Sequence, residues 1–76
     1  MVQRLTQFIT KNFKFVVYAA AGQKLSGNEK AVHEGSDARA VMQWLNHEGD
    51  RIRPGALKIW QKPDGTYLHL VREITG

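Results

Sequence analysis

The sequence predicts an α+β protein in which a small antiparallel four-stranded sheet carries one main helix packed on one face. Three observations support this class. Apolar residues recur at helical spacing in one well-bounded segment, alternating or continuous apolar runs lie on both sides of it, and turn-forming residues separate these runs. The expected order is (α)-β-β-α-β-β. A length of 76 residues predicts a single small domain over residues 1–76.

The first expected element, over residues 2–12, has an ambiguous pattern. Its apolar residues fall on one face of a helix: Val2, Leu5, Phe8 and Ile9. Two threonines and the β-branched run that follows weaken the prediction of a helix. We expect a short helix here and keep a strand as the alternative.

The next segment predicts a β-hairpin. Residues 13–20, FKFVVYAA, form the first strand, because Phe13, Phe15 and Val17 alternate onto one face. The opposite face is half polar. Residues 29–34, EKAVHE, form a short second strand, and the sequence SGNE at residues 26–29, which overlaps its first residue, is typical of a turn. The hairpin is therefore expected to have a long tip.

The tripeptide HEG occurs twice, at residues 33–35 and 47–49, and brackets the predicted main helix. Ser36 is the expected N-cap, and Asp37 places a negative charge at the positive end of the helix dipole. Gly49 is expected to end the helix with a positive φ. The apolar stripe consists of Ala38, Val41, Met42 and Leu45, widened by Trp44.

This placement excludes a metal site shared by His33 and His47. About 12 helical residues separate them, and at ~1.5 Å per residue the helix spans roughly 18 Å. Each imidazole bound to a zinc ion lies ~2 Å from it. A site that combines one of these histidines with His69 stays a minor alternative. We expect no metal and no cofactor.

The C-terminal third predicts a second hairpin after a polar loop at residues 50–55. Residues 56–62, ALKIWQK, and 66–73, TYLHLVRE, are the strands, and Pro63-Asp64-Gly65 joins them as a type I turn with a G1 bulge. If Lys62 lies opposite Thr66, one face pairs Trp60 with Leu68 and Lys58 with Leu70. The other face carries Leu57, Ile59, His69 and Val71.

Several classes of protein are disfavoured by what the sequence lacks. It has no cysteine, so we expect no disulfide and no thiolate chemistry, which suits a cytoplasmic location. No apolar run approaches the ~20 residues of a membrane span, so we expect no membrane partner. Phosphate-binding loops and nucleophile motifs are also absent, so we expect no enzyme. A small nuclease that depends on His33 or His69 is a minor alternative, although His69 in mid-strand is more typical of a packed histidine.

The charge distribution points to an anionic partner. The net charge is +4, residues 1–28 contain four basic residues and no acidic residue, and the charges of residues 29–76 cancel. Such one-sided charge favours nucleic acid or an acidic protein surface, although +4 is also an ordinary solubility charge. The expected nucleic-acid-binding residues are Arg4, Lys11, Lys14, Tyr18, Lys24, Lys58 and Lys62.

The favoured function is therefore a non-enzymatic, accessory or regulatory binding module that contacts nucleic acid, or a complex that handles it, through the N-terminal hairpin. The alternative is a homodimeric or inhibitory protein–protein module whose interface anchors are Trp60, Tyr67 and Leu68. In size and element order the chain resembles small phage and mobile-element proteins that inhibit a host protein complex by steric blockade. A simpler interpretation places Trp60 in the core, with lysines around it.

Overall fold

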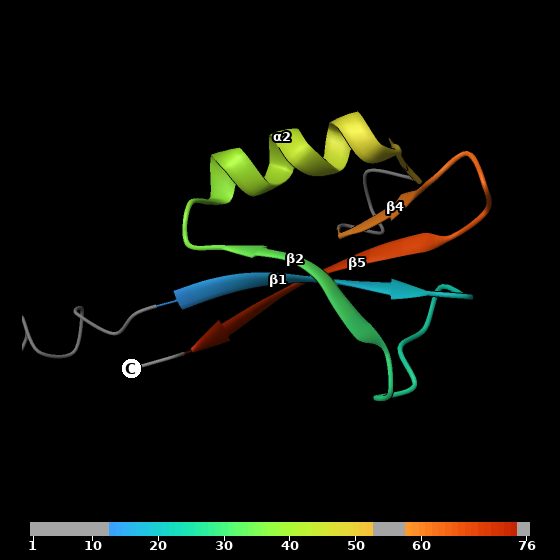
Figure 1. Ribbon diagram of the computed structural model, residues 1–76, viewed down its shortest axis with the longest axis horizontal. Coiled ribbons are helices and arrows are strands. Elements are labelled where there is room, and N and C mark those ends of the chain that lie inside the picture. The colour runs from blue at the N-terminus through green and yellow to red at the C-terminus, as the bar shows by residue number, and fades with distance from the viewer. Residues whose placement is uncertain (1–12, 53–57, 75–76) are drawn as a thin grey trace, which may run out of the picture.

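The computed structural model describes residues 13–52 and 58–74, which form one helix packed across a five-stranded antiparallel sheet (Figure 1). In chain order the elements are β1 (Phe13–Ala20), β2 (Lys30–Gly35), α2 (Ala38–Glu48), β3 (Asp50–Arg51), β4 (Ile59–Gln61) and β5 (Tyr67–Ile74). The α+β class is confirmed, whereas the predicted number of four strands is wrong. The element predicted over residues 2–12 lies outside the described residues.

The centre of the sheet is formed by the first and the last described strands. β1 and β5 pair in one uninterrupted antiparallel register, from Phe13 opposite Ile74 to Ala20 opposite Tyr67. The full order is β2-β1-β5-β4-β3, so β2 and the two-residue β3 are the edges. The crossing of β1 and β5 below the helix is visible in Figure 1.

The predicted N-terminal hairpin is confirmed by the antiparallel pairing of β1 with β2. Its register is interrupted once, because Val17 lies opposite His33 but Tyr18 lies opposite Ala31. Val32 is the extra residue of this β-bulge, and its side chain is 48% exposed. A bulge bends an edge strand and disturbs its ladder, which discourages unwanted pairing with other strands.

The core lies between α2 and one face of the sheet. The buried cluster consists of Val17, Val41, Leu45, Trp60 and Leu68, with Phe15, Ala19, Met42, Trp44 and Leu70 packed around it. The predicted helical stripe is thus confirmed at Val41, Leu45, Met42 and Trp44. Ala38 is the exception, because it is exposed at the first position of the helix.

Both ends of the helix differ from their predicted details. Asp37, not Ser36, is the N-cap, and its Oδ1 accepts a hydrogen bond from the backbone N–H of Arg39 at 3.0 Å. Gly49 does end the helix, with its N–H donating to the Leu45 carbonyl at 3.0 Å, but its φ is −165°. The prediction of a positive φ is wrong, since this is extended backbone that any residue adopts.

Close backbone contact is what requires glycine at position 49. A Cβ atom added there would lie 2.5 Å from the carbonyl oxygen of Gln61 and 3.0 Å from the nitrogen of Lys62. The chain passes directly from the helix into β3, which pairs with β4 through Asp50 opposite Gln61. The polar loop predicted over residues 50–55 therefore begins with a short strand, and residues 53–57 lie outside the described residues.

The C-terminal hairpin confirms the predicted turn and register. Lys62 N–H donates to the Thr66 carbonyl at 2.8 Å, and Gly65 has a φ of 94°. Asp64 Oδ1 accepts from the Thr66 N–H at 2.9 Å, which explains aspartate at that turn position. Trp60 lies opposite Leu68 as predicted, and the Leu70 N–H donates to the Lys58 carbonyl.

Candidate functional site

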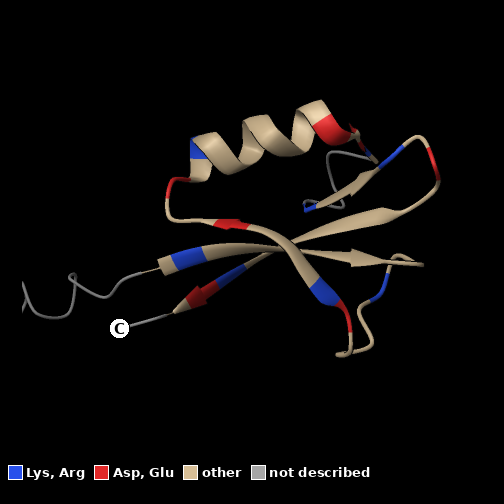
Figure 2. Ribbon diagram, in the orientation of Figure 1, with Lys and Arg blue, Asp and Glu red and all other residues tan. Residues whose placement is uncertain are grey.

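The residues predicted to bind nucleic acid do not share one patch. Lys14 and Tyr18 lie on the sheet face away from the helix, because the alternate β1 residues Phe15 and Val17 pack against the core. Lys24 belongs to the loop between β1 and β2. Lys58 and Lys62 flank β4, which β5 separates from β1 (Figure 2). Arg4 and Lys11 lie outside the described residues.

The described part of the protein is close to neutral. It contains eight lysines and arginines and seven acidic residues, compared with 11 and 7 in the whole chain. The remaining basic residues are Arg4, Lys11 and Arg53. The positive excess that suggested an anionic partner therefore belongs mainly to residues outside the described ranges.

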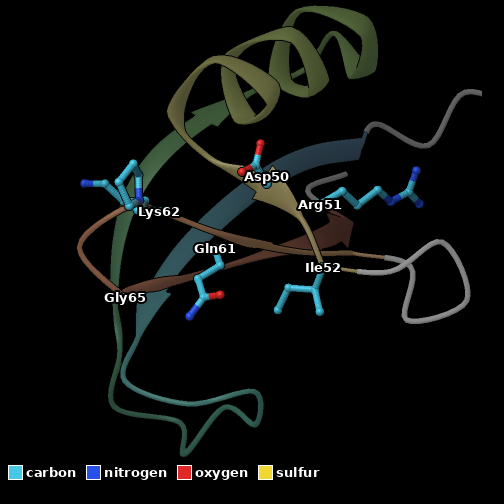
Figure 3. A pocket seen from close by; sticks show the side chains of 7 residues that line it. Asp50, Arg51, Ile52, Gln61, Lys62 and Gly65 are labelled. Carbon is cyan, nitrogen blue, oxygen red and sulfur yellow. The ribbon is translucent and has the colours of Figure 1, made fainter.

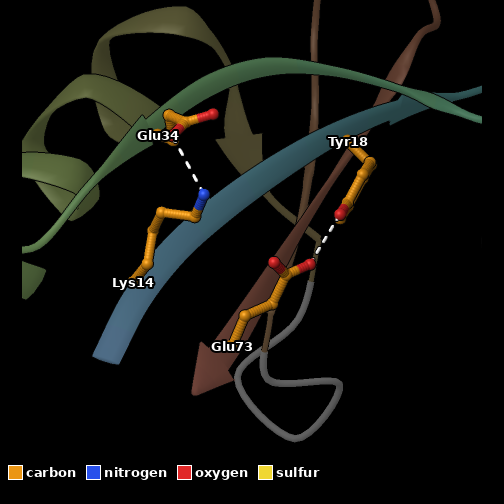
Figure 4. Close-up of polar contacts among 4 residues, drawn as sticks. All are labelled: Lys14, Tyr18, Glu34 and Glu73. Carbon is orange, nitrogen blue, oxygen red and sulfur yellow. Dashed lines mark hydrogen bonds and ion pairs between the residues drawn. The ribbon is translucent and has the colours of Figure 1, made fainter. Parts of the chain in front are cut away.

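Lys14 is engaged in an ion pair on the face away from the helix. Its Nζ lies 3.2 Å from Glu34 Oε1, and both side chains are partly exposed (Figure 4). Exposed ion pairs of this kind contribute little to stability, ~0–1 kcal/mol. The pair nevertheless cancels the charge that Lys14 would offer to a phosphate.

Tyr18 lies in a negative environment. Its hydroxyl donates a 2.6 Å hydrogen bond to Glu73 Oε2 across β1 and β5 (Figure 4). This bond, desolvation, and the charges of Glu73 and Glu34 raise the pKa of the phenol above its ordinary value of 10.0. A phosphate next to this ring would meet the same repulsion as the phenolate. Tyr18 therefore does not suit the base-stacking role predicted for it beside a nucleic-acid backbone.

The tip of the hairpin combines two exposed lysines with a turn held by one carboxylate. Lys24 and Lys30 are both exposed and flank this turn. Glu29 accepts hydrogen bonds from the N–H and hydroxyl of Ser26, at 2.8 and 2.7 Å, and from the N–H of Gly27 at 2.9 Å. The bonds from Ser26 are the main cause that lowers the pKa of Glu29 to about 2.

Glu29 in this turn and Lys30 beside it were not among the site residues predicted from the sequence. Glu29 was expected both to end the turn sequence SGNE and to begin the second strand; it closes the turn, and β2 begins at Lys30. Gly27 adopts a φ of 102°, which favours glycine. The sequence SGNE does carry this information, since a serine three residues before a glutamate in a glycine-containing loop is a local hydrogen-bonding pattern. We name Lys24, Glu29 and Lys30 the basic tip.

Two of the three predicted interface anchors are core residues. Trp60 is 0% exposed and Leu68 is 2% exposed. The indole N–H of Trp60 donates to Asn46 Oδ1 on the helix at 2.8 Å, so its polar atom is also satisfied inside the fold. As folded, Trp60 and Leu68 offer no surface to a partner. Tyr67 is half-buried on the opposite sheet face.

The histidines occupy three separate environments. His33 stacks on Trp44 with ring centroids 4.1 Å apart and planes 5° from parallel, which joins edge strand β2 to the helix. His69 is 6% exposed, and its Nε2 lies 2.9 Å from the Gly22 carbonyl, so that nitrogen carries the proton and donates. His47 is exposed beside Glu48. Among residues 13–52 and 58–74, no group of three or more possible metal ligands occurs.

Concave regions also lie outside the core, among the residues that the structure describes. One, of about 500 Å³, lies beside edge strand β3 and is lined by Asp50, Arg51, Ile52, Gln61, Lys62, Pro63 and Gly65 (Figure 3). The Arg51 guanidinium lies 5.4 Å from the centre of the Trp60 ring, so it covers the core from this side. Another, of about 190 Å³, lies between β1, β5 and the loop after β1, and is lined by Tyr18, Leu25, Gly27, Glu29 and Val71.

Comparison with known proteins adds no family to these observations. No family model, curated protein or solved structure matches the chain. The described helix is too short to cross a membrane. The geometry of the described residues is therefore the basis for any functional proposal.

Proposed function

We propose that this protein is a small non-enzymatic binding module that contacts nucleic acid, or a complex that handles nucleic acid, through the basic tip of its N-terminal hairpin. The observation that supports the proposal is the arrangement of charge at the tip. Lys24 and Lys30 are exposed, while the carboxylate of Glu29 is hydrogen-bonded within the turn. Lys24 belongs to the loop between β1 and β2 and Lys30 begins β2, and this loop lies on the side of the sheet away from the helix (Figure 1).

Two lysines supply a modest phosphate contact. Each phosphate neutralised on duplex DNA releases counterions, and the logarithm of the affinity then falls with the logarithm of the salt concentration by ~0.9 per contact. Lys24 and Lys30 together predict a slope of about −2. Such binding is weak and independent of base sequence, which suits an accessory role.

The test compares two charge-reversed double variants in a binding assay. Lys24→Glu with Lys30→Glu removes the basic tip. Arg39→Glu with Arg72→Glu makes the same change in net charge on the helix and on β5, where both residues are exposed. Fluorescence anisotropy with a labelled mixed-sequence oligonucleotide, at low and at moderate salt, measures binding.

We expect the tip variant to lose binding and the control variant to retain it with the salt slope of the unmodified protein. Equal binding by the two variants would show that net charge alone drives association. Binding that does not respond to salt would exclude the phosphate mechanism.

A second candidate function is contact with a protein through edge strand β2. The observation that favours it is Val32, an apolar side chain left 48% exposed on an outer strand of the sheet. If β2 is the contact, Val32→Lys lowers the affinity or the mass in solution, whereas Val32→Thr keeps the β-branched shape and changes little. Light scattering after size-exclusion chromatography measures the mass, and identical masses for all three proteins at high concentration would exclude self-association through β2.

A further inference from the structure

The hollow beside Tyr18 has a shape and chemistry that the two lysines of the basic tip do not use. It lies on the sheet face away from the helix, where the loop after β1 folds back over β1 and β5. Its volume of about 190 Å³ is roughly six times the ~30 Å³ that one water molecule occupies in the liquid. The space is therefore large enough for one side chain of a partner.

The walls of the hollow are mainly apolar. Leu25 forms the outer wall and is 41% exposed, Val71 belongs to β5, and the ring of Tyr18 belongs to β1. Part of the apolar surface of Leu25 is open to water, and covering it would be favourable by ~25 cal/mol per Å². An aliphatic chain inserted here would cover Leu25 and Val71 together.

Two carboxylates lie at or next to the hollow. Glu29 lines the hollow. Glu73 does not line it but lies next to it, because its Oε2 accepts a 2.6 Å hydrogen bond from the hydroxyl of the lining residue Tyr18. Lys24 and Lys30 flank the loop, but neither lines the hollow. The hydrogen bond to Glu73 is the main cause that raises the pKa of Tyr18, and desolvation and the charges of Glu73 and Glu34 act in the same direction.

Both carboxylates retain free acceptor capacity. A carboxylate offers about four lone-pair positions. Glu29 uses three of them for Ser26 and Gly27. Within the described part of the chain, the only hydrogen bond accepted by the side-chain carboxylate of Glu73 comes from the hydroxyl of Tyr18. A donor group that enters the hollow can therefore be bonded without breaking the turn.

We propose that this hollow binds a lysine or arginine side chain presented by a basic segment of a partner protein. The aliphatic stem would pack between Leu25 and Val71, and the cationic head would lie against the Tyr18 ring within reach of the two carboxylates. Aromatic rings attract cations through their faces, and long basic side chains bury their stems while their charge stays at a polar rim.

This ligand class explains the site better than the alternatives. A nucleic-acid backbone would be repelled by Glu29 and Glu73. A divalent metal would find only two carboxylates, and one of them, Glu29, already accepts three hydrogen bonds within its turn. A neutral apolar ligand would leave the free acceptor positions unused.

The first measurement is an NMR titration of the whole isotopically labelled protein with n-butylguanidinium, which reproduces the stem and head of arginine. n-Butanol is the matched neutral probe. We expect butylguanidinium to shift the amide signals of Tyr18, Leu25, Gly27 and Val71 in the millimolar range, and n-butanol to shift them far less. Shifts spread evenly over Asp37, Asp50 and Asp64 would indicate general attraction to acids and overturn the proposal.

The second measurement uses Glu73→Gln, which removes one charge and keeps an acceptor for the Tyr18 hydroxyl. Glu48→Gln on the helix is the matched control, because it changes the net charge equally at a distant position. We expect butylguanidinium to bind roughly two- to fivefold more weakly to the Glu73 variant, the range that a partly exposed ion pair supports. Equal affinity for the two variants would overturn the proposal.

A peptide then tests the occupant itself. An Arg-Gly-Gly repeat peptide should compete with butylguanidinium for the same signals, and a citrulline version of it, which lacks the charge, should not. Competition by an oligonucleotide instead would overturn the assignment to a basic protein. Neither Lys24 nor Lys30 lines the hollow, so the variant with Lys24→Glu and Lys30→Glu should still bind butylguanidinium.

Discussion

Replacing Gly49 with alanine should destabilise the protein through a backbone clash. Gly49 joins the helix to β3 and has an extended φ of −165°, so the conformation itself accepts alanine. The space does not. An alanine Cβ would lie 2.5 Å from the Gln61 carbonyl oxygen and 2.7 Å from its carbonyl carbon. These are backbone atoms, so no side-chain rotation can relieve the contact.

The size of the effect follows from what must move. Ordinary contact begins near 3.4 Å, so the oxygen of Gln61 and the new Cβ must separate by close to an ångström. β3 has two residues, Asp50 and Arg51, and such a shift endangers their pairing with β4. Overpacking costs ~1–3 kcal/mol, and one or two lost hydrogen bonds at ~0.5–1.5 kcal/mol each give the same range.

The loss in the free energy of unfolding is measured by urea unfolding monitored through tryptophan fluorescence. For a small domain the free energy of unfolding falls by ~1 kcal/mol per molar urea. The expected loss of ~1–3 kcal/mol therefore lowers the urea concentration at the unfolding midpoint by about 1–3 M. Gly22→Ala is the control, because a Cβ at Gly22 meets no atom within 4 Å. We expect that variant to be unchanged or more stable by up to ~1 kcal/mol.

Gly49→Asn separates the two explanations for this glycine. Asparagine is the residue best tolerated, after glycine, where φ is positive. If close backbone contact is the cause, asparagine destabilises the protein at least as much as alanine does. A Gly49→Asn variant as stable as the original protein would refute the reasoning.

Three further predictions concern packing and pH. A double-mutant cycle with His33→Ala and Trp44→Ala should give a coupling of ~0.5–1.5 kcal/mol for the stacked rings, and a coupling near zero would show that the stack contributes nothing. The folded-state pKa of Glu29 is lowered from 4.5 to about 2, so its contribution is complete above pH 4.5 and is lost as the pH falls towards 2. The stability gap between the protein and Glu29→Gln should therefore narrow between pH 6 and pH 2.5 in urea unfolding, and a constant gap would contradict this. Trp60→Ala should cost ~3–5 kcal/mol by the same assay, whereas a change in mass at full stability would favour an interface role.

The parts of the fold that were predicted correctly depend on local chemistry. The turn at residues 63–65 and its register follow from proline, aspartate and glycine at three successive positions, and the structure confirms both. The main helix follows in the same way from its apolar spacing. Each of these patterns is contained within about a dozen neighbouring residues, so the sequence carries it directly.

The parts that were missed depend on contacts between distant residues. Nothing near Phe13 indicates that it lies opposite Ile74, so the strand order was open. β3 is too short to form a pattern and exists because β4 lies beside it. The alternation Lys58-x-Trp60-x-Lys62 fits a core and an exposed face equally well, and only the helix above it decides that Trp60 is inside.

The candidate site shows the same limit. Lys24 was assigned correctly to the hairpin loop, but Lys30 and Glu29 gained their roles only when the turn around Ser26 was seen. The hollow beside Tyr18 brings together Leu25 from that loop and Val71 from the last strand. No spacing rule joins two residues so far apart in the chain.

The central position of β5 has a consequence for how the chain acquires its structure. β5 is the last described strand in the sequence, and β1 is the first, yet each completes the ladder of the other. Pairings between the two ends of a chain raise the contact order and slow folding, because a long loop must close before they form. During synthesis, β1 is left without its central neighbour until residues 67–74 have emerged. A nascent chain that stalls before that point keeps Val17 and Trp60 without Leu68, and such exposed apolar surface invites aggregation.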